Sequence, residues 1–212
     1  MHPLRARPAP VALSLGAGLV LGLAGPVAGK SDSAVCVALS AVFSGGWPWA
    51  GYAFAVGWLR RSRIESALLA SVGLAVAVVA YYMFKDVSPA IPDGAVPAGT
   101  VAGASGGGVP SGVVAWGTAA FVLGAPLGLL GNLARMAGAG GLACRLVVPL
   151  VALFETSLRL HTEVAADPVV VLTWKVTRFA VGLVALALVG HAVRSRWRGR
   201  RARVRSDEVV RS

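Results

Sequence analysis

The chain has 212 residues, of which 56% are hydrophobic and only 14% are charged, and its mean hydropathy is +0.73. Soluble domains carry about 25% charged residues, so this composition excludes an ordinary water-soluble globular protein. The formal net charge of +11 is not spread along the chain, because eight of the twenty basic residues follow position 193. This distribution argues against a nucleic-acid-binding surface.

Six apolar runs approach the ~20 residues that a helix needs to cross a bilayer. They cover residues 10–28, 34–59, 64–84, 113–133, 142–160 and 168–192. Only helices and closed barrels satisfy their backbone hydrogen bonds inside lipid, and these runs lack the alternation of barrel strands. We therefore predict an all-α, polytopic bundle of about six transmembrane helices, formed by a single domain over residues 1–193.

The first run has two interpretations. Arg5 and Arg7 precede it and small residues near Gly29 follow it, as in a secretory signal peptide. An uncleaved transmembrane helix is the alternative that we favour, because it gives the better distribution of charge between the loops.

The second run is interrupted by the sequence Ser-Gly-Gly-Trp-Pro-Trp at positions 44–49. Proline removes a backbone donor and glycine loosens a helix, so we predict a break near Trp47 and Pro48. The segment is either one kinked span or an outer surface helix followed by a short helix that starts near Pro48. Broken helices also build binding sites in membrane proteins, so the break is of functional interest.

Basic residues indicate the orientation of the bundle. They lie before the first run, between the second and third, after the fourth and after the sixth: Arg5, Arg7, Arg60, Arg61, Arg63, Arg135 and the tail. The positive-inside rule then predicts that both termini are cytoplasmic. Residues 85–110, rich in proline and glycine, form a flexible extracytoplasmic loop, and residues 194–212 form a basic cytoplasmic tail that attracts anionic lipid headgroups.

Closely spaced glycines occur on two of the predicted helices. Gly18 and Gly22 on the first, and Gly124 and Gly128 on the fourth, place small surfaces one turn apart. Such surfaces let helices approach closely. We expect tight packing within the chain, with homo-oligomerisation or binding of partner helices as the alternative.

Motifs of soluble enzymes are absent from the sequence. It contains no phosphate-binding loop, no dinucleotide fingerprint, no zinc-type Cys/His spacing and no acidic pair suited to magnesium and a diphosphate. Cys36 and Cys144 fall near opposite membrane faces, so we expect neither a disulfide nor a metal site. We expect no cofactor and no nucleic-acid partner.

Charged residues inside the last two spans are the candidate ligand-binding site. These residues and a neighbouring aromatic are Glu155, Arg159, Trp174, Lys175 and Arg178. An ionisable group at the bilayer centre costs at least ~2.5 kcal/mol and normally has a partner. Counting inward from the short loop between the spans places Glu155 and Arg178 at similar depth, so we predict that they form a pair, with Arg159 and Lys175 as rivals.

Three functions are compatible with these residues. The leading hypothesis is a protein that binds or translocates a small ligand through a polar intramembrane pocket. The second is a membrane-embedded enzyme of the cyclase or isomerase type, with Glu155 as general acid on a lipid or isoprenoid substrate. The third is an assembly partner that uses the glycine faces. The sequence does not decide whether the chain is an enzyme.

Two stretches of the sequence carry a resemblance to a known family. The first is Gly-Gly-Trp-Pro-Trp at 45–49 with Ala-Phe-Ala-Val-Gly at 53–57 and then Tyr81 and Tyr82; the second is the glycine-rich run 124–131 with Glu155 downstream. Together they resemble an actinobacterial family of small polytopic membrane proteins of unknown function. The resemblance implies a bacterial plasma membrane and no particular activity.

Overall fold

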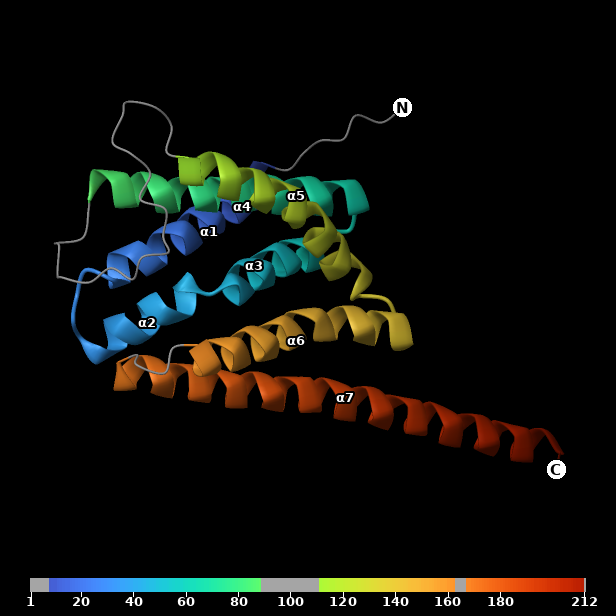
Figure 1. The fold of residues 1–212 in the computed structure, drawn as a ribbon. Helices are drawn as coiled ribbons and strands as arrows, with labels where there is room; N and C mark the ends of the chain where they lie inside the picture. The colour runs from blue at the N-terminus through green and yellow to red at the C-terminus, as the bar shows by residue number, and fades with distance from the viewer. Residues whose placement is uncertain (1–7, 89–110, 163–166, 212) are drawn as a thin grey trace, which may run out of the picture.

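The structure, a computed structural model, describes residues 8–88, 111–162 and 167–211, and all its regular structure within these ranges is helical (Figure 1). The helices are α1 (Pro8–Ala28), α2 (Ala34–Ser44), α3 (Gly46–Leu59), α4 (Arg63–Val87), α5 (Ser111–Leu133), α6 (Ala139–Thr162) and α7 (Pro168–Arg211). Five of them are long and apolar enough to cross a membrane, and the bent pair α2 and α3 forms a sixth candidate. The predicted all-α, polytopic bundle is confirmed.

Several helices extend beyond the predicted spans, and the extensions of α4 and α7 include basic residues. Helix α4 continues to Val87, so Lys85 belongs to its last turn, where a cation interacts favourably with the helix dipole. Helix α7 is 44 residues long and continues through most of the predicted tail, because arginine is a good helix former. Most of the predicted extracytoplasmic loop, residues 89–110, lies outside the described residues, as do Arg5 and Arg7.

The break in the second span lies at Gly45, and the two helices that it separates are bent by 67°. The predicted break is therefore confirmed, and the second helix begins at Gly46. A kinked span and a surface helix followed by a short helix are both compatible with this geometry. Pro48 falls in the first turn of α3, where backbone N–H groups have no partner within the helix. Proline is consequently tolerated there, and it does not itself make the break.

Glycines bring the helix backbones into direct contact. A Cβ atom added to Gly22 of α1 would lie 2.1 Å from the carbonyl oxygen of Ala77 in α4, and one added to Gly128 of α5 would lie 2.5 Å from that of Ser66. Gly57 of α3 meets Gly128 in the same way, at 1.9 Å from its carbonyl oxygen. For these helices the expected tight packing within the chain is confirmed.

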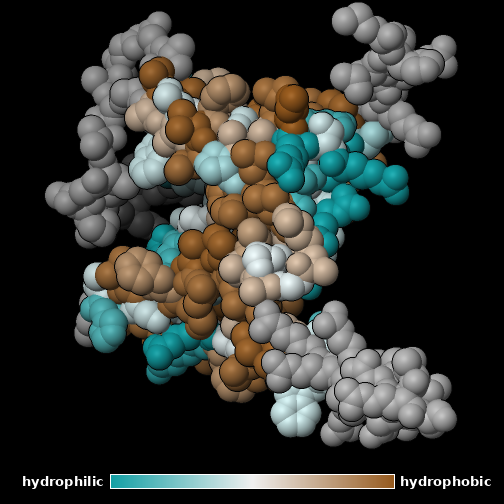
Figure 2. All heavy atoms as spheres, turned by 90° about the vertical axis from the view of Figure 1, so that its right-hand side faces the viewer, coloured by the Kyte–Doolittle hydropathy of each residue, from teal (hydrophilic) through white to brown (hydrophobic). Residues whose placement is uncertain are grey.

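A buried arginine ties together one end of the bundle. Arg60, between α3 and α4, is only 9% exposed, and its guanidinium donates to Ser14 Oγ of α1 at 2.8 Å and to the carbonyl oxygen of Pro10. Its own carbonyl oxygen accepts from Asn132 Nδ2 at 2.6 Å and from Arg135 Nη1 at 3.1 Å. Arg60 therefore joins α1 to the connection between α3 and α4. Figure 2 views the molecule from the right-hand side of Figure 1. Hydrophilic residues (teal) lie next to hydrophobic ones (brown) on this face.

The helices form two groups on either side of the bent pair (Figure 1). Helices α1 and α5 both pack against α4 on one side. A core of small and aliphatic residues lies between α3 and α4, and it includes Ala53, Val56, Ala70 and Leu74. Helices α6 and α7 lie on the other side, where α7 is outermost and contacts α6 and α2. Over Pro168–Ser195, α7 is apolar and none of its most apolar stretch is buried, as a lipid-facing helix requires.

Candidate functional site

The five predicted site residues come from the last two helices, Glu155 and Arg159 from α6 and the other three from α7. The structure divides them into two groups. Glu155, Arg159 and Trp174 lie against the break between α2 and α3, whereas Lys175 and Arg178 face a groove between α6 and α7.

Glu155 caps the beginning of α3. Its carboxylate oxygens accept from the main-chain N–H of Gly46 at 2.8 and 3.0 Å and from that of Trp47 at 2.9 Å. The first N–H groups of a helix have no partner in the helix, and they form the positive end of its dipole. A carboxylate supplied by another helix therefore accepts from these N–H groups and also carries the negative charge that the dipole favours.

Arg159 binds the other side of the break, at the C-terminal end of α2. Its Nε lies 3.2 Å from Glu155 Oε1, one helical turn away, and its Nη2 donates to the carbonyl oxygen of Ser44 at 3.1 Å. Ser44 is the last residue of α2, so this carbonyl belongs to the negative end of that helix. The Glu155–Arg159 ion pair thus joins the two sides of the break. We call this pair, with the main-chain groups of Ser44, Gly46 and Trp47 that it binds, the clasp.

Gly45 leaves the clasp the room that it needs. A Cβ atom at Gly45 would lie 3.1 Å from Glu155 Oε1 and 3.2 Å from the carbonyl oxygen of Val42. Both contacts are tighter than those that real Cβ atoms normally make. A side chain at this position would therefore push the carboxylate away from the N–H groups of α3.

Trp174 connects the clasp to α7. Its side chain is 1% exposed, and the guanidinium carbon of Arg159 lies 4.8 Å from the centroid of the indole ring. A cation over an aromatic face within about 6 Å is attracted by the ring quadrupole. Trp174 therefore stacks on the clasp and does not line the groove.

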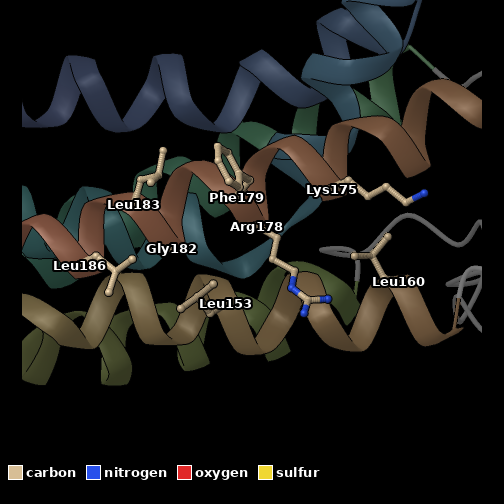
Figure 3. Close-up of a pocket in the computed structure, with 8 residues that line it drawn as sticks. All are labelled: Leu153, Leu160, Lys175, Arg178, Phe179, Gly182, Leu183 and Leu186. Atoms are coloured by element: carbon tan, nitrogen blue, oxygen red, sulfur yellow. The ribbon is translucent and has the colours of Figure 1, made fainter.

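The predicted pair between Glu155 and Arg178 is wrong, and the rival Arg159 is the partner of Glu155. Among the described residues, the only ion pairs are Glu155–Arg159 and Arg60–Glu65. The prediction used depth in the membrane alone, which does not specify the face of the helix. Trp174 occupies the part of α7 nearest the clasp, and Arg178 is directed into the groove (Figure 3).

The α6–α7 groove has a volume of about 530 Å³. It is lined by Leu153, Leu160, Lys175, Arg178, Phe179, Gly182, Leu183 and Leu186. Lys175 and Arg178 extend toward the same end of the groove, where Leu160 lies (Figure 3). Among the residues that the structure describes, no acidic side chain lines this groove, and the charged ones that line it are Lys175 and Arg178.

Sequence reasoning missed the main-chain part of the site. It consists of the N–H groups of Gly46 and Trp47 and the carbonyl of Ser44. Main-chain groups cannot be recognised from the residue type, although the break itself was predicted. In the described ranges, no three His, Cys, Asp or Glu side chains gather to hold a metal ion. His161 is exposed, and Glu163 lies outside the described residues.

Comparison of the chain with protein-family models, with curated proteins and with solved structures finds no match. The functional interpretation therefore depends on the geometry of the clasp and the groove. The resemblance to an actinobacterial membrane family stays a prediction.

Proposed function

We propose that this integral membrane protein binds a small anionic ligand in the α6–α7 groove. The observation that carries the proposal is the pair of exposed cations, Lys175 and Arg178, at one end of an apolar groove without an acidic neighbour among the described residues. Ionisable groups within transmembrane segments are costly and normally have a partner. Arg159 pairs with Glu155, whereas no ion pair joins Lys175 or Arg178 to another residue that the structure describes. A bound anion would supply both cations with a counterion.

The depth of these cations suits a ligand that enters from the membrane surface. The apolar part of α7, Pro168–Ser195, has 28 residues, or roughly 42 Å of helix, which exceeds the ~30 Å hydrocarbon core. If the excess is divided equally between the two ends, Lys175 and Arg178 begin roughly 5 and 9 Å below the hydrocarbon boundary. Their long side chains can extend from there to the headgroup level.

The clasp supports a binding protein over an enzyme that uses Glu155 as general acid. A general acid has to donate a proton to the substrate. The Glu155 carboxylate instead accepts from two main-chain N–H groups and from Arg159, which is the role of a structural cap. Passage of the ligand along the break between α2 and α3 would require the clasp to open, so the proposal is limited to binding.

The location of the protein is part of the same proposal. A bacterial plasma membrane with both termini in the cytoplasm places the Lys175 end of the groove in the outer leaflet. The distribution of Lys and Arg between the loops supports this orientation.

Thermal unfolding of the purified protein in a neutral detergent tests the proposal, with octyl phosphate as the soluble probe. A ligand that binds only the folded state stabilises it by about 2.7 kcal/mol at one hundred times its Kd, which raises the Tm by several degrees. We expect this rise in the wild type and its loss in the Lys175→Gln/Arg178→Gln variant. Arg194→Gln removes an exposed cation of the same helix outside the groove, and it should respond like the wild type. Equal shifts in all three proteins, or none, would reject the groove as an anion site.

A further inference from the structure

We propose that the ligand of the α6–α7 groove is a phospholipid with an anionic headgroup. Its phosphate would bind Lys175 and Arg178, and one acyl chain would lie along Leu153, Leu183 and Leu186. This inference rests on the proposed function and specifies the chemical class of the anion.

The groove changes from charged to apolar along its length. Lys175 and Arg178 lie at the Leu160 end, whereas Leu153 of α6 and Leu186 of α7 lie between the helices toward the other end (Figure 3). The distance along α7 from Lys175 to Leu186 is roughly 16 Å at 1.5 Å per residue. A phospholipid in the leaflet next to the charged end would match this order. Its charged headgroup would lie beside Lys175 and Arg178, and its acyl chain would extend toward Leu186.

A free inorganic anion is a poorer occupant of the groove. It would lose its hydration on entering an apolar site, and burial of an ion without full compensation is costly. It would also leave the walls formed by Leu153, Phe179 and Leu183 without a partner. A phospholipid brings its phosphate to the interface already, and its chain covers those walls.

A second copy of the chain is also a poorer occupant. A two-fold axis along the membrane normal brings the same surface of each copy together at the same depth. Lys175 and Arg178 would then face their own equivalents, and the groove offers no acidic side chain among the described residues to compensate them. Like charges would oppose such a dimer.

Gly182 provides a way to fill the groove without disturbing the fold. Apart from the local backbone of α7, nothing lies within 4 Å of a Cβ atom placed there, and Gly182 lines the groove, so a leucine at this position would extend into the space proposed for the ligand. Gly190 lies two turns further along α7, is equally open and does not line the groove. Gly182→Leu and Gly190→Leu are therefore a matched pair of test and control.

Native mass spectrometry of the full chain in a neutral detergent tests the inference, with dioleoyl phosphatidylglycerol as the anionic lipid and dioleoyl phosphatidylcholine as the zwitterionic one. We expect the wild type to retain one phosphatidylglycerol in preference to phosphatidylcholine. The Lys175→Gln/Arg178→Gln variant should weaken this binding about thirtyfold, from the usual contribution of two basic residues near a membrane surface. Gly182→Leu should weaken it at least tenfold, while Gly190→Leu should bind like the wild type. The basic tail is intact in every variant, so lipid bound there does not alter the comparison.

The alternative outcomes distinguish this inference from the proposed function. If inorganic phosphate or octyl phosphate competes with the lipid at a similar concentration, and Gly182→Leu changes nothing, the site binds anions but not lipid, and only the inference fails. If phosphatidylglycerol binds all four proteins equally and octyl phosphate stabilises none selectively, both fail. A wild-type dimer that Gly182→Leu converts to a monomer would show that a second copy fills the groove, and would overturn the lipid assignment.

Discussion

The carboxylate of Glu155 on α6 binds the main-chain N–H of Gly46, the first residue of α3, at 2.8 Å across a separation of 109 positions in the chain. The break leaves main-chain groups at the end of α2 and the start of α3 without partners in their own helices. This contact and the hydrogen bond from Arg159 to Ser44 provide partners for them. The clasp holds together two helices that are bent by 67° at Gly45. It also gives a structural role to Glu155 and Arg159, two of the charged residues in the last two spans.

Removing the carboxylate of Glu155 should destabilise the protein. Glu155→Ala leaves the first N–H groups of α3 without an acceptor and Arg159 without a counterion, which should lower the free energy of unfolding by roughly 2–3 kcal/mol. Glu155→Gln keeps one acceptor oxygen and should cost less. Unfolding in detergent, followed by circular dichroism, measures both effects. Glu65→Gln is the control, because Glu65 is more exposed and its nearest approach to Arg60 is 3.8 Å. Equal effects at Glu65 and Glu155 would show that the clasp contributes nothing specific.

A double-mutant cycle identifies the partner of Glu155. We expect a coupling free energy of about 1–3 kcal/mol between Glu155→Gln and Arg159→Gln, since the two side chains are in contact. The same cycle with Arg178→Gln should give less than about 0.5 kcal/mol, the usual limit for independent sites. Strong coupling to Arg178 would restore the pair that depth alone suggested, and would remove Arg178 from the ligand site.

The spans could be predicted because lipid imposes a simple requirement on the sequence. Each crossing needs a long apolar run, and the run 34–59 carries its own signal for a break. The partner of Glu155 could not be predicted in the same way. Depth along the membrane normal follows from counting residues, but the face that a side chain presents depends on how each helix is rotated, and tertiary packing determines that rotation.

The main-chain groups of the clasp could not be predicted from the sequence for a related reason. Glycine was expected at the break because it loosens a helix. In the structure, Gly45 also makes room for a side chain from another helix, 3.1 Å from where its own Cβ would be. Such a requirement becomes visible only when the two helices are seen together.

Close helix contacts predict a sharp difference between glycines. Gly57→Ala would place a methyl group 1.9 Å from the carbonyl oxygen of Gly128 on α5, so we expect a loss of at least about 3 kcal/mol or failure to fold. Gly117→Ala, on α5 with no atom within 4 Å, should be neutral or stabilising by up to about 1 kcal/mol, because alanine is the better helix former. Expression level and Tm measure both changes. A Gly57→Ala protein as stable as the wild type would contradict the backbone contact between α3 and α5.

The predicted orientation can be measured by cysteine labelling. Cys36 and Cys144 are first replaced by serine, and single cysteines are then introduced at Gly106 or at Ser206. An impermeant thiol reagent should label the cysteine at Gly106 on intact cells, and should label the one at Ser206 only after the cells are permeabilised. The opposite pattern would reverse the topology and would place the groove's charged end in the inner leaflet.

A structure of the protein in nanodiscs that contain phosphatidylglycerol would show whether a lipid occupies the groove. We expect an elongated density in the α6–α7 groove, with its headgroup within hydrogen-bonding distance of Lys175 and Arg178 and with Glu155 bound to Arg159. A groove closed by protein side chains, with Arg178 turned onto Glu155, would contradict this expectation.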